Sequence, residues 1–160
     1  MTILLLASCQ NKSAKESITS SSASIDSTSN ATAEQIKQPV AMDSLVAFYG
    51  KKFKQDKLFE QFRIIPRIKK IMGNNFNEFQ SGWGDESEIK KDGEIVYASA
   101  CKSVDCRTLK VLLVIDCLTN NLNVYIFNDK KIRTYEESNI IGLTETIGTQ
   151  YEKLRDDQNN

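Results

Sequence analysis

Residues 109–127 have the sequence LKVLLVIDCLTNNLNVYIF, and this stretch decides the fold. Leu109–Leu118 is almost continuously apolar, Thr119–Asn121 has the composition of a turn, and Leu122–Phe127 has the alternating pattern of a second strand. Two strands joined by so short a turn pair antiparallel. Because the first of them is apolar on both faces, it is predicted to be central in its sheet and covered on both sides.

The remaining predicted strands flank this pair. Asp92-Gly93 is a two-residue hairpin signal between Glu86–Lys90 and Glu94–Cys101, and Asn128–Lys130 turns the chain into Lys131–Tyr135. Because the links are short and the strands follow one another in sequence, the pattern predicts a five-stranded antiparallel meander.

Helical patterns precede and follow these strands. Residues 42–81 carry apolar residues at helical spacing, with Pro66 suited to a first helical turn and Gly73 to a C-terminal stop. Leu143–Arg155 also has helical spacing. The predicted fold class is therefore α+β, a five-stranded antiparallel sheet with helices packed on one face.

Composition excludes several classes of function. The chain has 160 residues and no histidine, which excludes Ser-His-Asp and Cys-His nucleophilic catalysis and removes the commonest transition-metal ligand. Lys and Arg together number 21, as do Asp and Glu, so net charge does not favour nucleic acid as a partner. Gly82-Trp83-Gly84 lacks the third glycine and the preceding strand of a phosphate-binding loop. We expect a protein that is not an enzyme, without a cofactor or a metal.

The N-terminus has the features of a lipoprotein signal. Met1–Cys9 is an apolar run whose end, Leu6-Ala7-Ser8-Cys9, resembles a bacterial lipobox, in which the cysteine is acylated and becomes the first residue of the mature protein. Only eight residues precede Cys9, and none of them is Lys or Arg. An apolar N-terminus without lipidation is therefore the alternative.

Three segments follow from this interpretation. Residues 1–9 are the lipoprotein signal, 10–38 form a disordered Ser-rich tether, and 39–157 form the folded domain. No apolar run approaches the roughly 20 residues that span a bilayer, so membrane association is expected through a lipid anchor only. The expected location is the bacterial cell envelope, periplasmic or exposed at the surface.

The most informative short stretch is ASACKSVDC, residues 98–106. Cys101 and Cys106 lie between adjacent predicted strands, so their Cα atoms can come within disulfide distance. A disulfide is expected in the oxidising compartment that an acylated Cys9 implies. The spacing does not match a redox Cys-x-x-Cys, and a zinc site would also need Cys117 and a carboxylate. Cys117 lies in the most apolar strand and is expected to be a buried free thiol.

This stretch resembles a family signature. Ser99-Ala100-Cys101-Lys102, two loop residues and Asp105-Cys106 are similar to Ser-Ala-Cys-Lys-Pro-His-Asp-Cys of the inhibitor of vertebrate lysozyme family, Ivy. The resemblance covers roughly residues 45–135. It implies a five-stranded antiparallel sheet with helices against it. It also implies an envelope protein that inserts its disulfide-closed loop into the active-site cleft of C-type lysozyme.

The resemblance assigns target binding to the loop residues Lys102, Ser103, Val104 and Asp105, closed by Cys101 and Cys106. Family members present a histidine to the two catalytic carboxylates of lysozyme, and the matching position here is Val104. A valine side chain neither donates a hydrogen bond nor carries charge. Lys102 is retained and can meet an acidic cleft.

Several functions remain open on the sequence. The first is a lipid-anchored inhibitor of a lysozyme-type peptidoglycan glycosidase. The second is an Ivy-like protein-binding or immunity lipoprotein with a different target, or a structural envelope lipoprotein. The third, a thiol-dependent envelope enzyme, lacks a histidine and an evident general base. A homodimer is left open. An acidic run over residues 78–94 would steer a cationic partner toward Asp85, Glu86 and Glu88.

Overall fold

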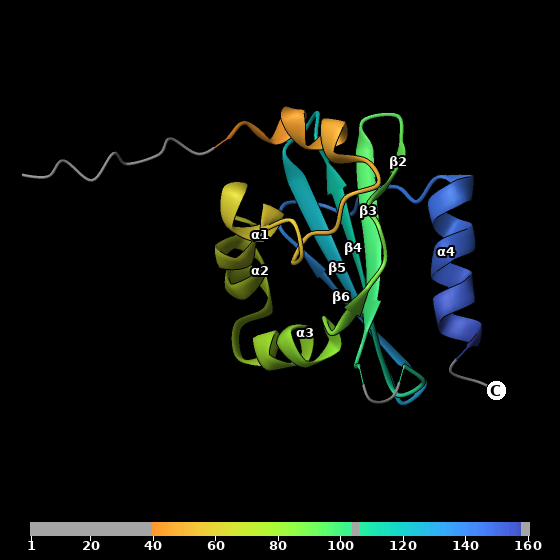
Figure 1. Cartoon of the computed structure of the whole chain (residues 1–160). Helices are drawn as coiled ribbons and strands as arrows, with labels where there is room; N and C mark the ends of the chain where they lie inside the picture. Colours follow the sequence, from red (N-terminus) through yellow and green to blue (C-terminus); the bar gives the residue numbers. More distant parts are fainter. Residues whose placement is uncertain (1–39, 104–105, 158–160) are drawn as a thin grey trace, which may run out of the picture. The chain divides into compact units, whose positions relative to one another are not determined.

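The computed structural model describes residues 40–103 and 106–157. Short helices come first, strands follow, and a longer helix ends the described chain (Figure 1). The helical segments are η1 (Met42–Phe48), α1 (Leu58–Gln61), α2 (Ile64–Met72), η2 (Gly73–Asn75), α3 (Phe76–Gly82) and α4 (Glu145–Asp156). The strands are β1 (Asp85–Glu86), β2 (Lys90–Asp92), β3 (Ile95–Cys101), β4 (Leu109–Asp116), β5 (Asn121–Asn128) and β6 (Lys131–Glu136).

The strands form one antiparallel sheet in the order β1-β3-β4-β5-β6, with β2 also paired to β3. The predicted α+β class and the antiparallel meander are therefore confirmed, with β4 in the centre. A two-residue turn joins β5 to β6, and both of its residues, Asp129 and Lys130, have positive φ, as the hairpin turns that match strand twist require.

The first predicted strand, Glu86–Lys90, is in fact two short strands. Between them the Ser87 side chain accepts a hydrogen bond from the Ser99 amide of β3. Ile89 is fully buried, and its backbone pairs with Gly50 and Lys51 instead of with β3. The edge of the sheet is interrupted here because the backbone of Ile89 pairs with Gly50 and Lys51, which follow η1, and leaves β3.

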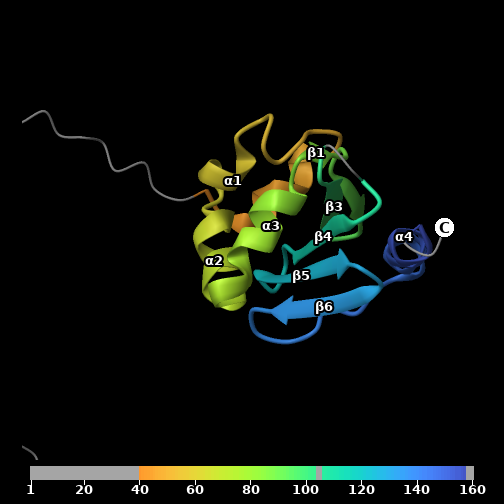
Figure 2. The ribbon, with the colours of Figure 1, turned by 90° about the horizontal axis from the view of Figure 1, so that it is seen from below.

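Helices cover both faces of the sheet, so the prediction of helices on one face is wrong. Val111 and Leu113 of β4 belong to the core beneath η1 and α1–α3. Leu112 and Val114 face the other way, into a second cluster that contains Ile147 and Leu154 of α4. Figure 2 shows α4 on the side of the sheet opposite α2 and α3. A strand that is apolar on both faces needs cover on both, and α4 provides the second layer.

The helical region 42–81 consists of several short pieces. Pro66 lies in the first turn of α2 and Gly73, at φ 53°, ends that helix, as predicted. Lys57 and Arg63 precede α1 and α2 in the left-handed conformation, which is costly for residues with a side chain. The short helical pieces are held together by contacts between aromatic rings, which belong to Phe53, Phe59, Phe76, Phe79 and Trp83.

None of the helices within residues 40–103 and 106–157 has both the length and the apolar character needed to cross a bilayer.

Candidate functional site

The loop between β3 and β4 projects from one end of the sheet. The amide of Lys102 donates to the carbonyl oxygen of Leu109 at 3.1 Å, and this bond joins the two sides of the loop at its base. Beyond it, the described loop residues are exposed to solvent; they are Lys102, Ser103, Cys106, Arg107 and Thr108. The loop therefore presents its side chains to a partner, whereas both its ends continue into strands of the sheet.

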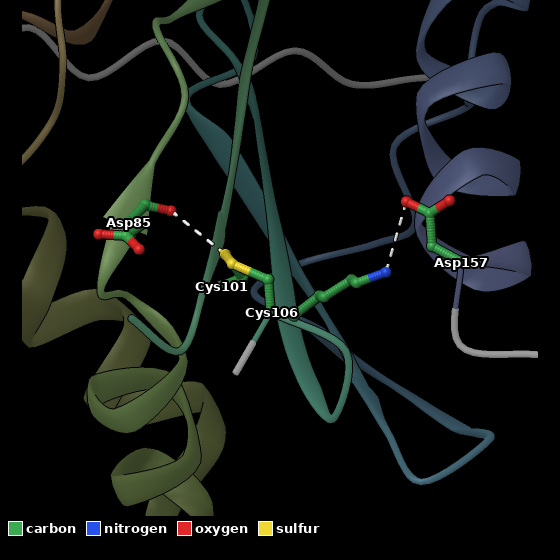
Figure 3. The surroundings of a disulfide bond; sticks show 5 residues. Asp85, Cys101, Cys106 and Asp157 are labelled. Carbon is green, nitrogen blue, oxygen red and sulfur yellow. Dashed lines mark hydrogen bonds and ion pairs between the residues drawn. A yellow bond between two sulfur atoms is a disulfide. The ribbon is translucent and has the colours of Figure 1, made fainter. Parts of the chain in front are cut away.

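Cys101 and Cys106 form the predicted disulfide (Figure 3). Their Cα atoms are 4.8 Å apart, and Cys101 is the last residue of β3. The Cys101 sulfur also lies 3.8 Å from the carbonyl oxygen of Asp85 in the neighbouring strand β1. The bridge therefore fastens the outer half of the loop to a residue that the sheet already holds in place.

The structure describes only part of the predicted target-binding loop. Lys102 and Ser103 are exposed on its first side. Val104 and Asp105 lie outside the described residues, so the prediction for these two positions stays a prediction.

Gly84 supports the base of the loop, a role that the amino-acid sequence does not indicate. Its amide donates to the carbonyl oxygen of Cys101 at 3.1 Å. A Cβ atom on Gly84 would lie 2.3 Å from Ser103 Oγ, 2.7 Å from Ser103 N and 2.8 Å from Cys101 O. Two of these atoms are backbone, so any side chain here would displace the loop. A lone glycine in sequence carries no sign of such a contact.

Glu86 has a structural role in addition to the predicted steering role, which stays a prediction for this residue. Its carboxylate accepts hydrogen bonds from the backbone amides of Lys54 and Gln55, at 3.0 and 2.9 Å, and from Trp83 Nε1 at 2.8 Å. These bonds tie the segment before α1 to the start of the sheet, with Trp83 buried in the core. Asp85 and Glu88 are exposed, and steering by these two stays a prediction.

Basic side chains gather at the loop end of the sheet. Lys102 and Arg107 belong to the loop, and Lys110 lies in the strand pair at its base, opposite Cys101. The turn between β5 and β6 ends at the same place because Leu109 pairs with Asn128. This turn adds the exposed Asp129 and Lys130, and the exposed Lys131 of β6 follows them. The basic side chains at this end suit an acidic surface or cleft.

Cys117 is the buried free thiol that the sequence predicts. It is 3% exposed, and burial, with smaller contributions from Asp116 and Glu94, raises the pKa of the thiol to about 11. It follows the far end of β4, seven residues beyond Lys110, or roughly 23 Å at about 3.3 Å per strand residue. Cys117 therefore cannot join the cysteine pair in a zinc site. The Asp85 carboxylate and the two other sulfurs lie within 4.8 Å of one another, but both sulfurs are already bonded in the disulfide.

A comparison with protein families matches residues 64–153 of this chain to the family described as inhibitor of vertebrate lysozyme (Ivy). The match contains the whole loop, the disulfide and the sheet from β1 to β6. No curated protein and no solved structure matches the chain.

Proposed function

Because the chain belongs to the family of inhibitors of vertebrate lysozyme, we propose that it inhibits a lysozyme-type peptidoglycan glycosidase by placing its disulfide-closed loop in the active-site cleft. The observation that carries this proposal is the family match over residues 64–153, with an exposed loop closed by Cys101–Cys106 inside it. The family is one of inhibitors, in agreement with the expectation that the chain is not an enzyme.

The construction of the loop supports this mode of binding. A segment that is already closed by a disulfide and anchored in two strands loses less conformational entropy on docking than a free segment does. Glycosidases of this type place two carboxyl groups on either side of the scissile bond. Lys102 and Arg107 bring positive charge toward such a pair of groups.

Val104 sets the expected strength of inhibition. It stands where the family signature has histidine, so its side chain can fill the cleft but cannot donate to a carboxylate. An unsatisfied buried polar group costs roughly 1–3 kcal/mol, and about 1.4 kcal/mol is one decade in affinity. We expect binding to C-type lysozyme at least about tenfold weaker than that of a histidine-bearing relative, and Val104→His to recover much of this difference.

The test is a lysozyme turbidity assay on peptidoglycan with the wild type, Val104→His, Asp105→Ala and the double variant. Asp105 is retained from the signature and is expected to brace the loop, so its loss should weaken inhibition in both backgrounds. If the wild type inhibits well and Val104→His gains nothing, the loop does not occlude the cleft. If neither inhibits, the target is another protein, such as the muramidase of a competing bacterium, or the protein has a structural role.

We also propose that acylated Cys9 anchors the protein to a membrane of the cell envelope, with residues 10–38 as the tether. The support is the similarity of Leu6–Cys9 to a lipobox. Mass spectrometry of peptides from the membrane fraction should find Cys9 acylated, and Cys9→Ser should move the protein to the soluble fraction. An unmodified Met1–Cys9 peptide from membranes would exclude the anchor.

A further inference from the structure

A hollow of about 360 Å³ lies beside the disulfide, on the side of the loop that faces α4. It is lined by Cys106, Arg107, Lys110 and Asp157. Its floor is Lys110, which is 5% exposed although it carries a charge. Charged lysines are seldom buried to this degree unless they are paired. The position of Lys110 beside the candidate binding loop therefore needs an explanation.

The sheet explains how Lys110 comes to be there. Lys110 pairs with Cys101 on one side and with Phe127 on the other, and directly opposed side chains project from the same face. This is the face that α4 covers, so the Lys110 side chain is covered, and its ammonium lies beside Asp157 at the end of α4. The carbonyl groups at the C-terminal end of α4 favour a cation at this place.

Lys110 has one ion-pair partner among the described residues, Asp157, the C-cap of α4 (Figure 3). The Nζ–Oδ2 distance is 3.4 Å, longer than the roughly 2.7–2.9 Å of a strong charge-assisted hydrogen bond. The Asp157 side chain is 51% exposed, so water competes for its carboxylate. An ammonium has three donors, more than one carboxylate oxygen uses, and the Lys110 side chain, 6% exposed, lines the hollow.

We propose that this hollow is a second binding site for the target, in which the Lys110 ammonium donates to a carboxylate of the target while the loop occupies the cleft. The proposal rests on the proposed function and deepens it. Asp157, itself part of the lining, places a carboxylate next to Lys110, so this ammonium already pairs with the kind of group that the target would offer. On binding, the target's carboxylate approaches the ammonium from solvent, and Asp157 competes with it. Lys110 is thus a binding residue outside the loop.

The first experiment measures the affinity of the full chain for immobilised C-type lysozyme. Lys110→Met keeps the aliphatic stem and removes the charge, and it should weaken binding about tenfold. Lys110→Arg keeps the charge and should bind within about threefold of the wild type. Asp157→Asn removes the competing carboxylate and should bind as tightly as the wild type or more tightly. Lys69→Met, on the exposed surface of α2, is the matched control and should have no effect.

Two results would overturn the proposal. One is a Lys110→Met variant that is folded and binds like the wild type. The other is an Asp157→Asn variant that loses as much affinity as Lys110→Met, because the ion pair would then act only by holding α4 in place. Thermal unfolding of each variant separates a lost contact from a lost fold.

A second probe separates this proposal from the proposed function. Acetate is titrated into the protein alone, with the backbone amide NMR signal of Arg107, which lines the hollow in the wild type and in Lys110→Met alike, as the readout and chloride as the control. If the wild type does not bind lysozyme but acetate gives a saturable shift that Lys110→Met abolishes, only the lysozyme-inhibitor function fails. If acetate shifts the signal no more than chloride does, the hollow does not bind carboxylates and the present inference fails.

Discussion

At the residue scale, Gly84 controls the position of the loop because it has no side chain, so the loop can pack directly against its backbone. The Cβ atom of Gly84→Ala would meet backbone atoms of Cys101 and Ser103 at less than 3 Å, so the loop base must move. We expect a loss of about 1–3 kcal/mol in the free energy of unfolding, with a loss of inhibition that exceeds what instability alone explains. Urea denaturation and the turbidity assay measure the two effects.

Gly148 provides the matched control for this substitution. It lies within α4, and a Cβ atom there would meet nothing within 4 Å. Gly148→Ala should therefore raise stability by about 0.5–1 kcal/mol, through the higher helix propensity of alanine, and leave inhibition unchanged. If Gly84→Ala were as stable and as inhibitory as Gly148→Ala, the close contact at Gly84 would not control the position of the loop.

Cys117 makes stability depend on pH in the alkaline range. Burial raises its thiol pKa to about 11 from an ordinary value of 9.0. Between these two values the unfolded chain releases the thiol proton while the folded chain keeps it, so the unfolded state binds fewer protons and stability falls as pH rises. The free energy of unfolding should fall by up to about 1.4 kcal/mol per pH unit in this range. Urea denaturation at pH values from 8 to 11 measures it.

The control for this prediction is Cys117→Ala, which lacks the thiol. Burial also raises the pKa of Tyr97 and Tyr125, and both remain in the variant, so the difference between the two pH profiles isolates Cys117. Native Cys117 should also resist labelling by a maleimide at neutral pH and react only in denaturant. Identical pH profiles, or rapid labelling of the native protein, would contradict the burial of this thiol.

At the element scale, α4 depends on Thr144, the residue before its first turn. The Thr144 hydroxyl accepts a hydrogen bond from the Ile147 amide at 3.4 Å and donates one to Asp92 Oδ2 at 2.6 Å. It therefore caps the helix and ties it to the turn between β2 and β3. Thr144→Ala should lower the free energy of unfolding by about 1–2 kcal/mol in urea denaturation, because both bonds are lost.

Thr144→Ser keeps the hydroxyl and should stay close to the wild type in the same measurement. A Thr144→Ala variant as stable as the wild type would mean that α4 is held by the apolar contacts of Ile147 and Leu154 alone.

At the scale of the whole molecule, the described residues contain two apolar clusters that together run from Met42 to Leu154. A chain that begins at Val40 should therefore fold independently and inhibit its target as the full chain does. Circular dichroism and the turbidity assay test this. A shortened chain that fails to fold would place part of the folded domain before Val40.

Much of the fold follows from local sequence. Strand order and pairing could be predicted because turn signals such as Asp92-Gly93 and Asn128–Lys130 lie between strands that are adjacent both in sequence and in space. The disulfide could be predicted for the same reason, since the link between β3 and β4 brings Cys101 and Cys106 together. The burial of Cys117 followed from its apolar neighbours.

Only the tertiary structure decided the features that join distant segments. Hydrophobic spacing shows that α4 has an apolar side but not which face of the sheet it covers. Glu86 looked like a free surface charge, yet it accepts bonds from Lys54 and Gln55, more than thirty residues earlier. Lys110 meets Asp157 because strand register places it under the end of α4. Local periodicity determines the elements of this protein, and the packing of its two layers of helices determines which side chains surround the loop.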